Sequence, residues 1–343
     1  MRPFTYARAD SPQAALAAFP SGESSSGNAP SVHATHQYLA GGTTLIDLMK
    51  LDVMRPTVVT DINAIEKTSS GRISFGDDGL KLGALVRMSQ AADHDAVKTN
   101  FPVIAQALQL AASAQIRNMA SLGGNVLQRT RCTYFRDTSY AQCNKRNPGS
   151  GCAAMEGVNR AHAVLGTSDQ CIASYPGDFG QALIALDATV EIASRNGTRT
   201  IPFAKLHRAP GSTPQVETTL APGELITAFH VPSMPWAKRS LFLKIRDRTS
   251  YEFALASAAV ALDLDNGTVR DVRIALGGVS ALPWRASAAE AMLKGKKLDA
   301  ATLKSAGDAA FAGARPRKYN AFKIELGKAT LARALHEAST LAI

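Results

Sequence analysis

The sequence predicts an α+β protein with more than one domain, and three observations lead to this prediction. The chain has 343 residues, which is more than one hydrophobic core usually supports. Hydrophobic residues make up 45% of it and charged residues 19%, as in ordinary globular proteins. Strand-like runs alternate with helical stripes along most of the chain. A break rich in proline at residues 231–236 marks the boundary that we expect between two domains.

The N-terminal part is expected to begin with a short helix. Ser11 precedes Pro12 and an alanine-rich run, which is typical of a capped helix start. Residues 21–28 are polar and glycine-rich, so we expect a loop there. Apolar and β-branched runs predict strands, and apolar stripes predict helices. The expected strands lie at residues 37–40, 58–62, 73–75, 80–83 and 189–193, and the helices at 45–49, 101–118 and 180–186.

The part after the break alternates strands with alanine-rich helices, which suggests a compact α+β domain. The expected elements are strands at residues 256–263 and 269–275 and helices at 286–293, 300–312 and 320–341.

The cysteines are the strongest chemical signal. All four lie in one loop-like segment, at Cys132, Cys143, Cys152 and Cys171, among turn-forming residues. Four thiolates in one loop can bind a metal centre, and basic neighbours would offset the negative charge of such a centre. We therefore expect metal ligation, with an iron–sulfur cluster as the first hypothesis. The basic residues of the segment are Arg129, Arg131, Arg136, Lys145, Arg146 and Arg160.

Three other interpretations of the cysteines remain open. Two disulfides are possible, although the chain is large enough to form a core without them. Zinc ligands usually come as C-x2-4-C pairs, and this chain has none. Four unrelated free thiols are also possible, since free cysteine is often buried as a small hydrophobic residue.

Two Gly-Gly segments suggest an anion site. Residues 39–45 join an expected strand to a helix, and residues 119–125 lie just before the cysteine segment. Glycines let the backbone approach an anion, with amide N–H groups as donors at a helix start. Neither segment matches the nicotinamide-type or P-loop pattern. A lone Gly-Gly is usually only a tight turn, but two such segments favour a dinucleotide pyrophosphate held from two sides.

The net charge of +10 is spread along the chain. It comes with no zinc-finger or helix-turn-helix spacing, so we do not expect nucleic-acid binding. No apolar run is long enough to span a membrane. Residues 1–6 have no apolar stretch and no twin arginine, so we expect no export signal in the chain itself.

Several segments carry a resemblance to a known family. Residues 39–49 and 118–127, and Pro176-Gly177-Asp178 with the helix after it, resemble the FAD-binding subunit of the xanthine dehydrogenase (molybdenum hydroxylase) family. The cysteine segment is similar to that of periplasmic aldehyde oxidoreductases. In that group, and in 4-hydroxybenzoyl-CoA reductase, the flavin subunit holds an extra 4Fe–4S cluster. Its matching runs are RCTYF (131–135), CNKR (143–146), PGSGC (148–152) and CIA (171–173).

The resemblance implies a fold and a function. Residues 1–232 would form an FAD-binding domain of the vanillyl-alcohol-oxidase (PCMH) type in two lobes, with a 4Fe–4S loop at about residues 128–175. Residues 238–343 would form a small α+β domain like that of the CO dehydrogenase flavoprotein. The partners would be a molybdenum-cofactor large subunit and a small subunit with two 2Fe–2S clusters. Aldehydes would become carboxylates at molybdenum, and electrons would pass from the 2Fe–2S clusters to FAD and an external acceptor.

The resemblance also implies site residues. Asp178 matches a position near the ribityl chain, Ile226 one that packs on the isoalloxazine, and Lys244 one beside the ring. For Ile226 the alternative is ordinary core packing, and for Lys244 a solvated surface charge. The cluster ligands would be the four cysteines. The pyrophosphate and ribityl contacts would come from Leu39, Ala40, Gly41, Gly42, Thr43, Thr44, Leu45, Ser121, Gly123, Gly124 and Asn125.

Two alternative functions follow from the residues alone. The chain could be a scaffold subunit, stabilised by a metal and without flavin, or a stand-alone flavin oxidase. The oxidase is disfavoured because the sequence has no recognisable nucleophile or acid–base pair. The compartment is periplasmic if a signal-bearing partner exports the assembly, and cytoplasmic otherwise. The sequence leaves open which aldehyde and acceptor are used and whether Tyr251 or Glu252 approaches the flavin.

Overall fold

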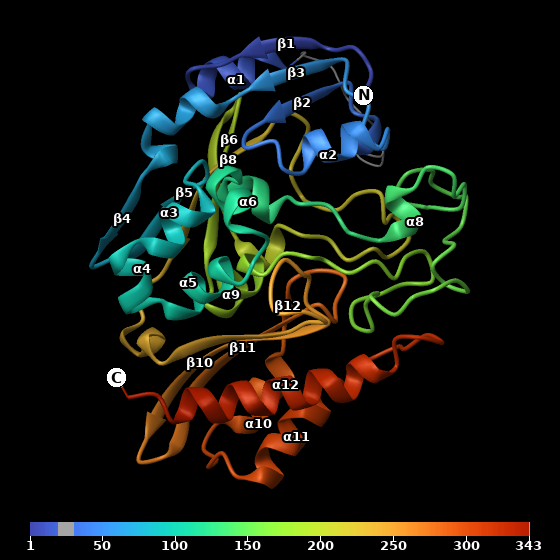
Figure 1. The fold of residues 1–343 in the computed structure, drawn as a ribbon. Coiled ribbons are helices and arrows are strands. Elements are labelled where there is room, and N and C mark those ends of the chain that lie inside the picture. The colour runs from blue at the N-terminus through green and yellow to red at the C-terminus, as the bar shows by residue number, and fades with distance from the viewer. Residues whose placement is uncertain (20–30, 343) are drawn as a thin grey trace.

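The computed structural model describes residues 1–19 and 31–342, and their strands form three sheets (Figure 1). The sheets have the strand orders β1-β3-β2, β4-β5-β8-β6-β7 and β12-β11-β10-β9. Helices cover the two larger sheets, so the α+β class predicted from the sequence is confirmed. The loop expected at residues 21–28 lies outside the described residues.

The smallest sheet belongs to the N-terminal lobe. Its strands are β1 (Thr5–Arg8), β2 (His36–Leu39) and β3 (Val58–Asp61), and both pairings are parallel. Helix α1 (Pro12–Ala18) begins after Ser11, whose side chain accepts a hydrogen bond from Ala14 N. Helix α2 (Leu45–Lys50) follows directly on the first Gly-Gly segment.

The second lobe is built on the five-stranded antiparallel sheet. Its strands are β4 (Ile73–Gly76), β5 (Gly79–Gly83), β6 (Thr189–Ser194), β7 (Gly197–Pro202) and β8 (Leu225–Val231). Apolar residues of the sheet form one buried core with apolar residues of the helices, because helix and strand each bury one apolar face. The helices are α3 (Met88–Asp93), α4 (Asp95–Asn100), α5 (Pro102–Gln109), α6 (Ala114–Met119), α7 (Leu122–Val126) and α9 (Phe179–Ala185).

The single helix predicted over residues 101–118 is wrong. The chain forms two helices there, α5 and α6, with a break between them. Ala112 adopts φ 51°, a left-handed conformation that interrupts a right-handed helix. Ser113 then caps α6, since its Oγ accepts a hydrogen bond from Ile116 N at 3.3 Å.

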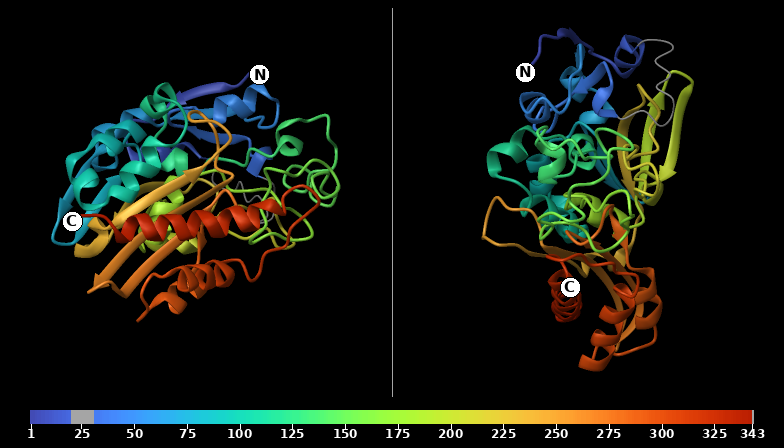
Figure 2. Two further views of the ribbon diagram at one scale, coloured as in Figure 1. Left: turned by 60° about the horizontal axis from the view of Figure 1, so that its bottom comes forward. Right: turned by 90° about the vertical axis from the view of Figure 1, so that its right-hand side faces the viewer.

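The C-terminal domain contains the four-stranded sheet and three helices. Alternate residues of β10 belong to different cores: Ala259 and Ala261 pack with the core of the second lobe, whereas Val260 and Leu262 pack with the C-terminal helices. The sheet therefore lies between α5 and α9 on one side and α10 to α12 on the other (Figure 2). The elements are β9 (Ser240–Ile245), β10 (Ala256–Asp265), β11 (Thr268–Gly277), β12 (Trp284–Arg285), α10 (Ser287–Leu293), α11 (Ala300–Ala310) and α12 (Phe322–Ser339).

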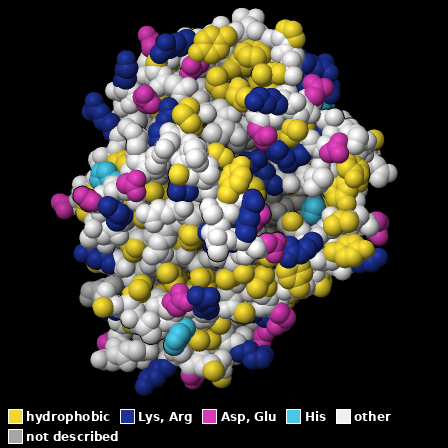
Figure 3. Space-filling model, in the orientation of Figure 1, with side chains coloured by type: hydrophobic (Ala, Val, Ile, Leu, Met, Phe, Trp, Pro, Cys, Tyr) yellow, Lys and Arg dark blue, Asp and Glu magenta, His cyan; other side chains and the backbone are white. Residues whose placement is uncertain are grey.

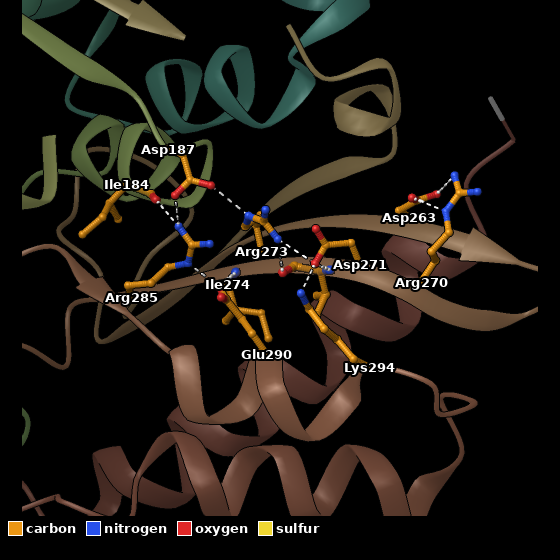
Figure 4. Close-up of polar contacts among 11 residues, drawn as sticks. Ile184, Asp187, Asp263, Arg270, Asp271, Arg273, Ile274, Arg285, Glu290 and Lys294 are labelled. Atoms are coloured by element: carbon orange, nitrogen blue, oxygen red, sulfur yellow. Dashed lines mark hydrogen bonds and ion pairs between the residues drawn. The ribbon is translucent and has the colours of Figure 1, made fainter. Parts of the chain in front are cut away.

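A polar network joins the two domains at the end of α9 (Figure 4). Asp187 accepts from Arg273 Nε at 2.9 Å and from Arg285 Nη1 at 2.7 Å, so one carboxylate holds two arginines of the C-terminal sheet. Glu290 of α10 pairs with Arg285 and also accepts from Ile274 N at 2.6 Å. The network fixes how the sheet sits against α9.

The cysteine segment, residues 127–178, has little regular structure apart from α8 (Thr133–Arg136). It extends beside the N-terminal lobe and the C-terminal domain, at the right of Figure 1. On the face in Figure 3, Lys and Arg side chains are interspersed with Asp and Glu, without one continuous basic stripe. None of the described helices has the length and apolarity needed to cross a membrane.

Candidate functional site

A cavity of about 880 Å³ lies between the N-terminal lobe, the five-stranded sheet and residues 206–224. Most of the residues predicted to bind FAD line it, although some of them are more than a hundred positions apart in the sequence. Leu39, Asn125, Asp178 and Lys244 are not among its lining residues. The predicted residues on the wall are Ala40, Gly41, Gly42, Thr43, Thr44, Leu45, Ser121, Gly123, Gly124 and Ile226.

The first Gly-Gly segment is shaped by close backbone contacts. A Cβ on Gly41 would lie 1.9 Å from Met119 O, so only glycine fits there. Gly42 has φ 75°, a conformation that glycine adopts without strain. In the described part of the chain, the N–H groups of Gly42 and Thr43 donate to no protein acceptor. They are available to an anion bound in the cavity.

The second Gly-Gly segment differs from the turn predicted for it. Gly123 and Gly124 lie inside the short helix α7, and neither has a positive φ. Gly123 N donates to Ala84 O at 2.8 Å, and Gly124 N donates to Ser121 Oγ at 3.2 Å. These amides are therefore already used within the protein. The second Gly-Gly segment therefore forms a part of the cavity wall without bulky side chains, beside the first Gly-Gly segment.

Asp178 and Lys244 form a buried ion pair between the two domains. Lys244 Nζ lies 2.6 Å from Asp178 Oδ2, and the two side chains are 1% and 5% exposed. Lys244 also donates to Leu110 O at 3.1 Å. Burial raises the pKa of Asp178, and the neighbouring Lys244 charge opposes this rise. Lys244 is thus not a solvated surface charge; the predicted role of either residue beside the flavin stays a prediction.

Two cavity residues were missed from the sequence. Tyr175 Oη and His207 Nε2 lie 3.0 Å and 3.1 Å from the same acceptor, Val126 O. Burial lowers the pKa of His207 to about 4, so its ring is neutral at pH 7 and donates from Nε2. Tyr175 directly precedes the Pro-Gly-Asp run that carried the resemblance, which was a usable signal. Tyr251, by contrast, is 54% exposed and does not line the cavity.

A buried charged trio lies in the cavity wall, where the cysteine segment meets residues 206–224. Glu217 lies 2.7 Å from Lys145 Nζ and is also paired with Arg129. Burial alone would raise the pKa of Glu217, but Arg129 and Lys145 outweigh it and hold that pKa below its usual value. All three residues line the cavity, as does Cys171. Cys171 is therefore the cysteine nearest to the candidate flavin site.

The four cysteines are brought together as unpaired thiols. None of them forms a disulfide, and Cys143 and Cys152 face each other in an antiparallel bridge. Burial raises the pKa of Cys132 to about 12, and the charges of the other three cysteines add to this rise. The same causes raise the pKa of Cys171 to about 11, against the opposing charge of Lys145. Buried thiols of this kind ionise readily only when a cation binds them.

Most basic side chains of the segment have acidic partners. Arg131 and Arg136 pair with Asp47 of α2, and Arg160 pairs with Asp247. Arg146 differs: it is buried and donates to three backbone carbonyls, those of Phe135, Asp137 and Tyr140. It has no carboxylate partner among the described residues.

The fold and the cavity define a class of protein. Residues 2–234 match the FAD binding domain in molybdopterin dehydrogenase, and residues 242–338 match the CO dehydrogenase flavoprotein C-terminal domain. The chain belongs to this family of FAD-binding oxidoreductase subunits, so the resemblance found in the sequence is confirmed.

Individual relatives narrow the comparison. The aldehyde oxidoreductase FAD-binding subunit PaoB of Escherichia coli is 44% identical over 345 residues, which cover 98% of this chain and 99% of PaoB. The glyceraldehyde dehydrogenase medium chain of Sulfolobus acidocaldarius is 28% identical over 86% of this chain and 83% of its own. Among solved structures, reconstituted CO dehydrogenase from Oligotropha carboxidovorans has a TM-score of 0.75 at 23% identity, covering 100% of both chains.

Proposed function

We propose that this chain is the FAD- and 4Fe–4S-containing electron-transfer subunit of a heterotrimeric molybdenum aldehyde oxidoreductase. Its partners would be a molybdenum-cofactor large subunit, which oxidises aldehydes to carboxylates, and a small subunit with 2Fe–2S clusters. When bound, FAD would accept electrons from those clusters and deliver them to an external acceptor. The 44% identity to PaoB, which is named for aldehyde oxidoreductase, supports this choice of substrate class.

The cavity fits FAD. The backbone N–H groups of the first Gly-Gly segment would hold the pyrophosphate, since they are free and the glycines leave room for close approach. Ser121 and the two glycines of α7 would form the opposite wall. Ile226 of β8 would supply an apolar contact to the ring system, because it is buried and lines the same cavity.

The cysteine segment suits a cluster better than a single ion. Within residues 1–19 and 31–342, no group of three or more His, Cys, Asp or Glu side chains is arranged to hold one metal ion. The four cysteines are nonetheless close enough for their charges to act on one another. A 4Fe–4S cluster is larger than an ion and needs its four thiolates farther apart. The lack of C-x2-4-C pairs argues against zinc, and the free thiols argue against two disulfides.

The observation that carries the proposal is a pair of buried basic side chains, neither of which forms an ion pair with the described residues. Arg146 is 5% exposed and Lys323 is 0% exposed, and both donate only to backbone carbonyls. An uncompensated buried charge costs several kcal/mol. Both side chains bind the backbone of the cysteine segment. Burial lowers the pKa of Lys323 to about 7. A cluster with four thiolate ligands is anionic and would stabilise the positive charges of both side chains, whereas four neutral thiols would not.

The test uses the purified trimer and the isolated chain. We expect about four irons per chain beyond the share of the small subunit, and loss of that iron in Cys152→Ser, which removes one thiolate. Zinc in place of iron, or two disulfides after native isolation, would contradict the cluster. The isolated flavin-loaded chain should not be reduced by an aldehyde under anaerobic conditions, because four thiolates leave the iron no open position for substrate. Bleaching of the isolated chain would favour a stand-alone oxidase.

Export with a partner is a separate part of the proposal. We infer a periplasmic location, reached by co-export with a signal-bearing partner, because the cysteine segment resembles that of periplasmic aldehyde oxidoreductases. Cell fractionation should find the chain in the periplasm when it is co-expressed with its partners. Deletion of the partner's signal should retain it in the cytoplasm; an unchanged distribution would contradict co-export.

A further inference from the structure

His162 lies beside one of the cysteines. Its Nε2 is 3.1 Å from Cys132 Sγ, and the residue is 6% exposed. A metal-bound thiolate can only accept a hydrogen bond, so in the loaded protein Nε2 must carry the proton and donate it to sulfur. Nδ1 of the ring has no hydrogen-bond partner in the described part of the chain. The usual second bond that would orient a histidine is therefore missing here, and something else must orient the ring.

The C-terminal domain holds the backbone around His162. Lys323, in the first turn of α12, donates to Ala161 O at 3.0 Å, His162 O at 3.2 Å and Gly278 O at 2.7 Å. Asn320 adds a bond from Nδ2 to Ala163 O at 3.1 Å. The two carbonyls beside the histidine are thus fixed to a helix from the other domain, and their position fixes the Cα from which the ring extends.

We propose that His162 and Lys323 are positioning residues that set the reduction potential of the cluster bound by Cys132. This inference rests on the cluster of the proposed function. Reduction adds negative charge to the cluster and its sulfurs. An N–H donor on Cys132 stabilises that added charge, and so raises the potential. Burial lowers the pKa of Lys323 to about 7; a bound anionic cluster would favour its protonated form, whose positive charge acts strongly in a buried region.

The geometry gives the two residues separate roles. His162 acts through a direct bond to one ligand, whereas Lys323 acts through the backbone of the histidine and through its own charge. Lys323 touches none of the cysteines in the hydrogen bonds described. Loss of Lys323 should therefore change the potential in the same direction as loss of His162, although the cysteines remain unaltered.

The experiment is a redox titration of the 4Fe–4S signal by electron paramagnetic resonance in the whole trimer. In His162→Leu we expect the ratio of oxidised to reduced cluster at a fixed solution potential to rise at least tenfold. This corresponds to a reduction potential lower by about 59 mV for a one-electron couple. His162→Gln retains an N–H donor and should recover part of the shift. Lys323→Met should shift the potential in the same direction. His336→Leu is the matched control, because His336 is exposed on the same helix, about 20 Å along its axis.

The outcomes separate this inference from the proposed function. Iron analysis accompanies each titration. A trimer without the extra iron overturns the cluster and this inference together. Full iron with one potential for the wild type, His162→Leu and Lys323→Met overturns the inference and leaves the cluster standing. If His162→Leu loses iron, the His162→Gln variant decides. A His162→Gln potential closer to the wild-type value than that of the remaining His162→Leu clusters supports the hydrogen-bond role. A potential that is no closer contradicts it.

Discussion

Replacing Asp178 by asparagine tests the buried ion pair that joins the two domains. Asp178→Asn keeps the shape of the side chain but leaves Lys244 charged at a site that is 1% exposed. The remaining partners of Lys244 would be Leu110 O and the new amide oxygen, neither of which carries a charge. Removing one member of a buried pair typically costs about 3–5 kcal/mol, because the other charge stays buried without compensation.

This free energy corresponds to a measurable change in melting temperature. The entropy of unfolding is about 2.1 cal/mol/K per residue, which for 343 residues gives roughly 0.7 kcal/mol/K. A cost of 3–5 kcal/mol should therefore lower Tm by about 4–7 °C. Calorimetry on the flavin-free protein measures it directly. The Asp178→Asn, Lys244→Met double variant should recover most of the loss, because it removes both charges.

The matched control breaks an exposed pair with the same chemical change. Glu337→Gln removes the Arg333–Glu337 pair, whose side chains are 61% and 38% exposed, and should cost at most about 1 kcal/mol. Equal Tm values for Asp178→Asn and Glu337→Gln would refute the reasoning, as would a double variant no more stable than Asp178→Asn. Titration with FAD tests the separate prediction that Asp178 lies near the ribityl chain: the variant should then bind FAD more weakly at a temperature where it is fully folded.

Two further predictions concern the cavity. Gly41→Ala should abolish FAD binding, because its Cβ would lie 1.9 Å from Met119 O. Gly76→Ala is the control: it has no atom within 4 Å of the new Cβ and should retain a normal ratio of flavin to protein absorbance. Equal flavin content in the two variants would contradict the close approach at Gly41. His207 has its pKa lowered to about 4 from 6.5 in the folded protein, so between these values the unfolded chain binds more protons and unfolding free energy falls as pH falls. Urea unfolding at pH 7 and 5 should show a loss of up to about 2 kcal/mol that His207→Asn removes, and an unchanged pH dependence in the variant would refute this cause.

Local backbone constraints explain what the sequence could predict. Gly41 and Gly42 stand where a side chain would collide with the chain or a left-handed φ is required, so the residue type itself carries the information. The cysteines could be assigned to one site because they are close in sequence. The break between α5 and α6 was not predictable in this way, because Ala112 adopts φ 51° without being glycine. Only the cap at Ser113 gave a signal for it.

Contacts between distant residues explain what the sequence could not provide. Residues 206–224 are rich in proline and glycine and suggest a connecting loop, yet many of them line the cavity. Tyr175 and His207 meet at Val126 O, which no local pattern encodes. The sequence predicts separate positions near the flavin for Asp178 and Lys244 and does not predict that they contact each other. Their pairing across 66 positions depends on how the C-terminal sheet packs on α9.

The charge around the cysteines illustrates the difference most clearly. The segment contains six basic residues, and from the sequence all six are expected to offset the charge of an anionic centre. In the structure five of the six have carboxylate partners, but these five share the three carboxylates of Asp47, Glu217 and Asp247, so only part of their positive charge is offset. Of that set only Arg146 has no carboxylate partner among the described residues, and Lys323, which likewise binds only backbone carbonyls there, comes from the other domain. A potential controlled by the protein would therefore depend on the positive charge that remains around the segment and on the bond from His162.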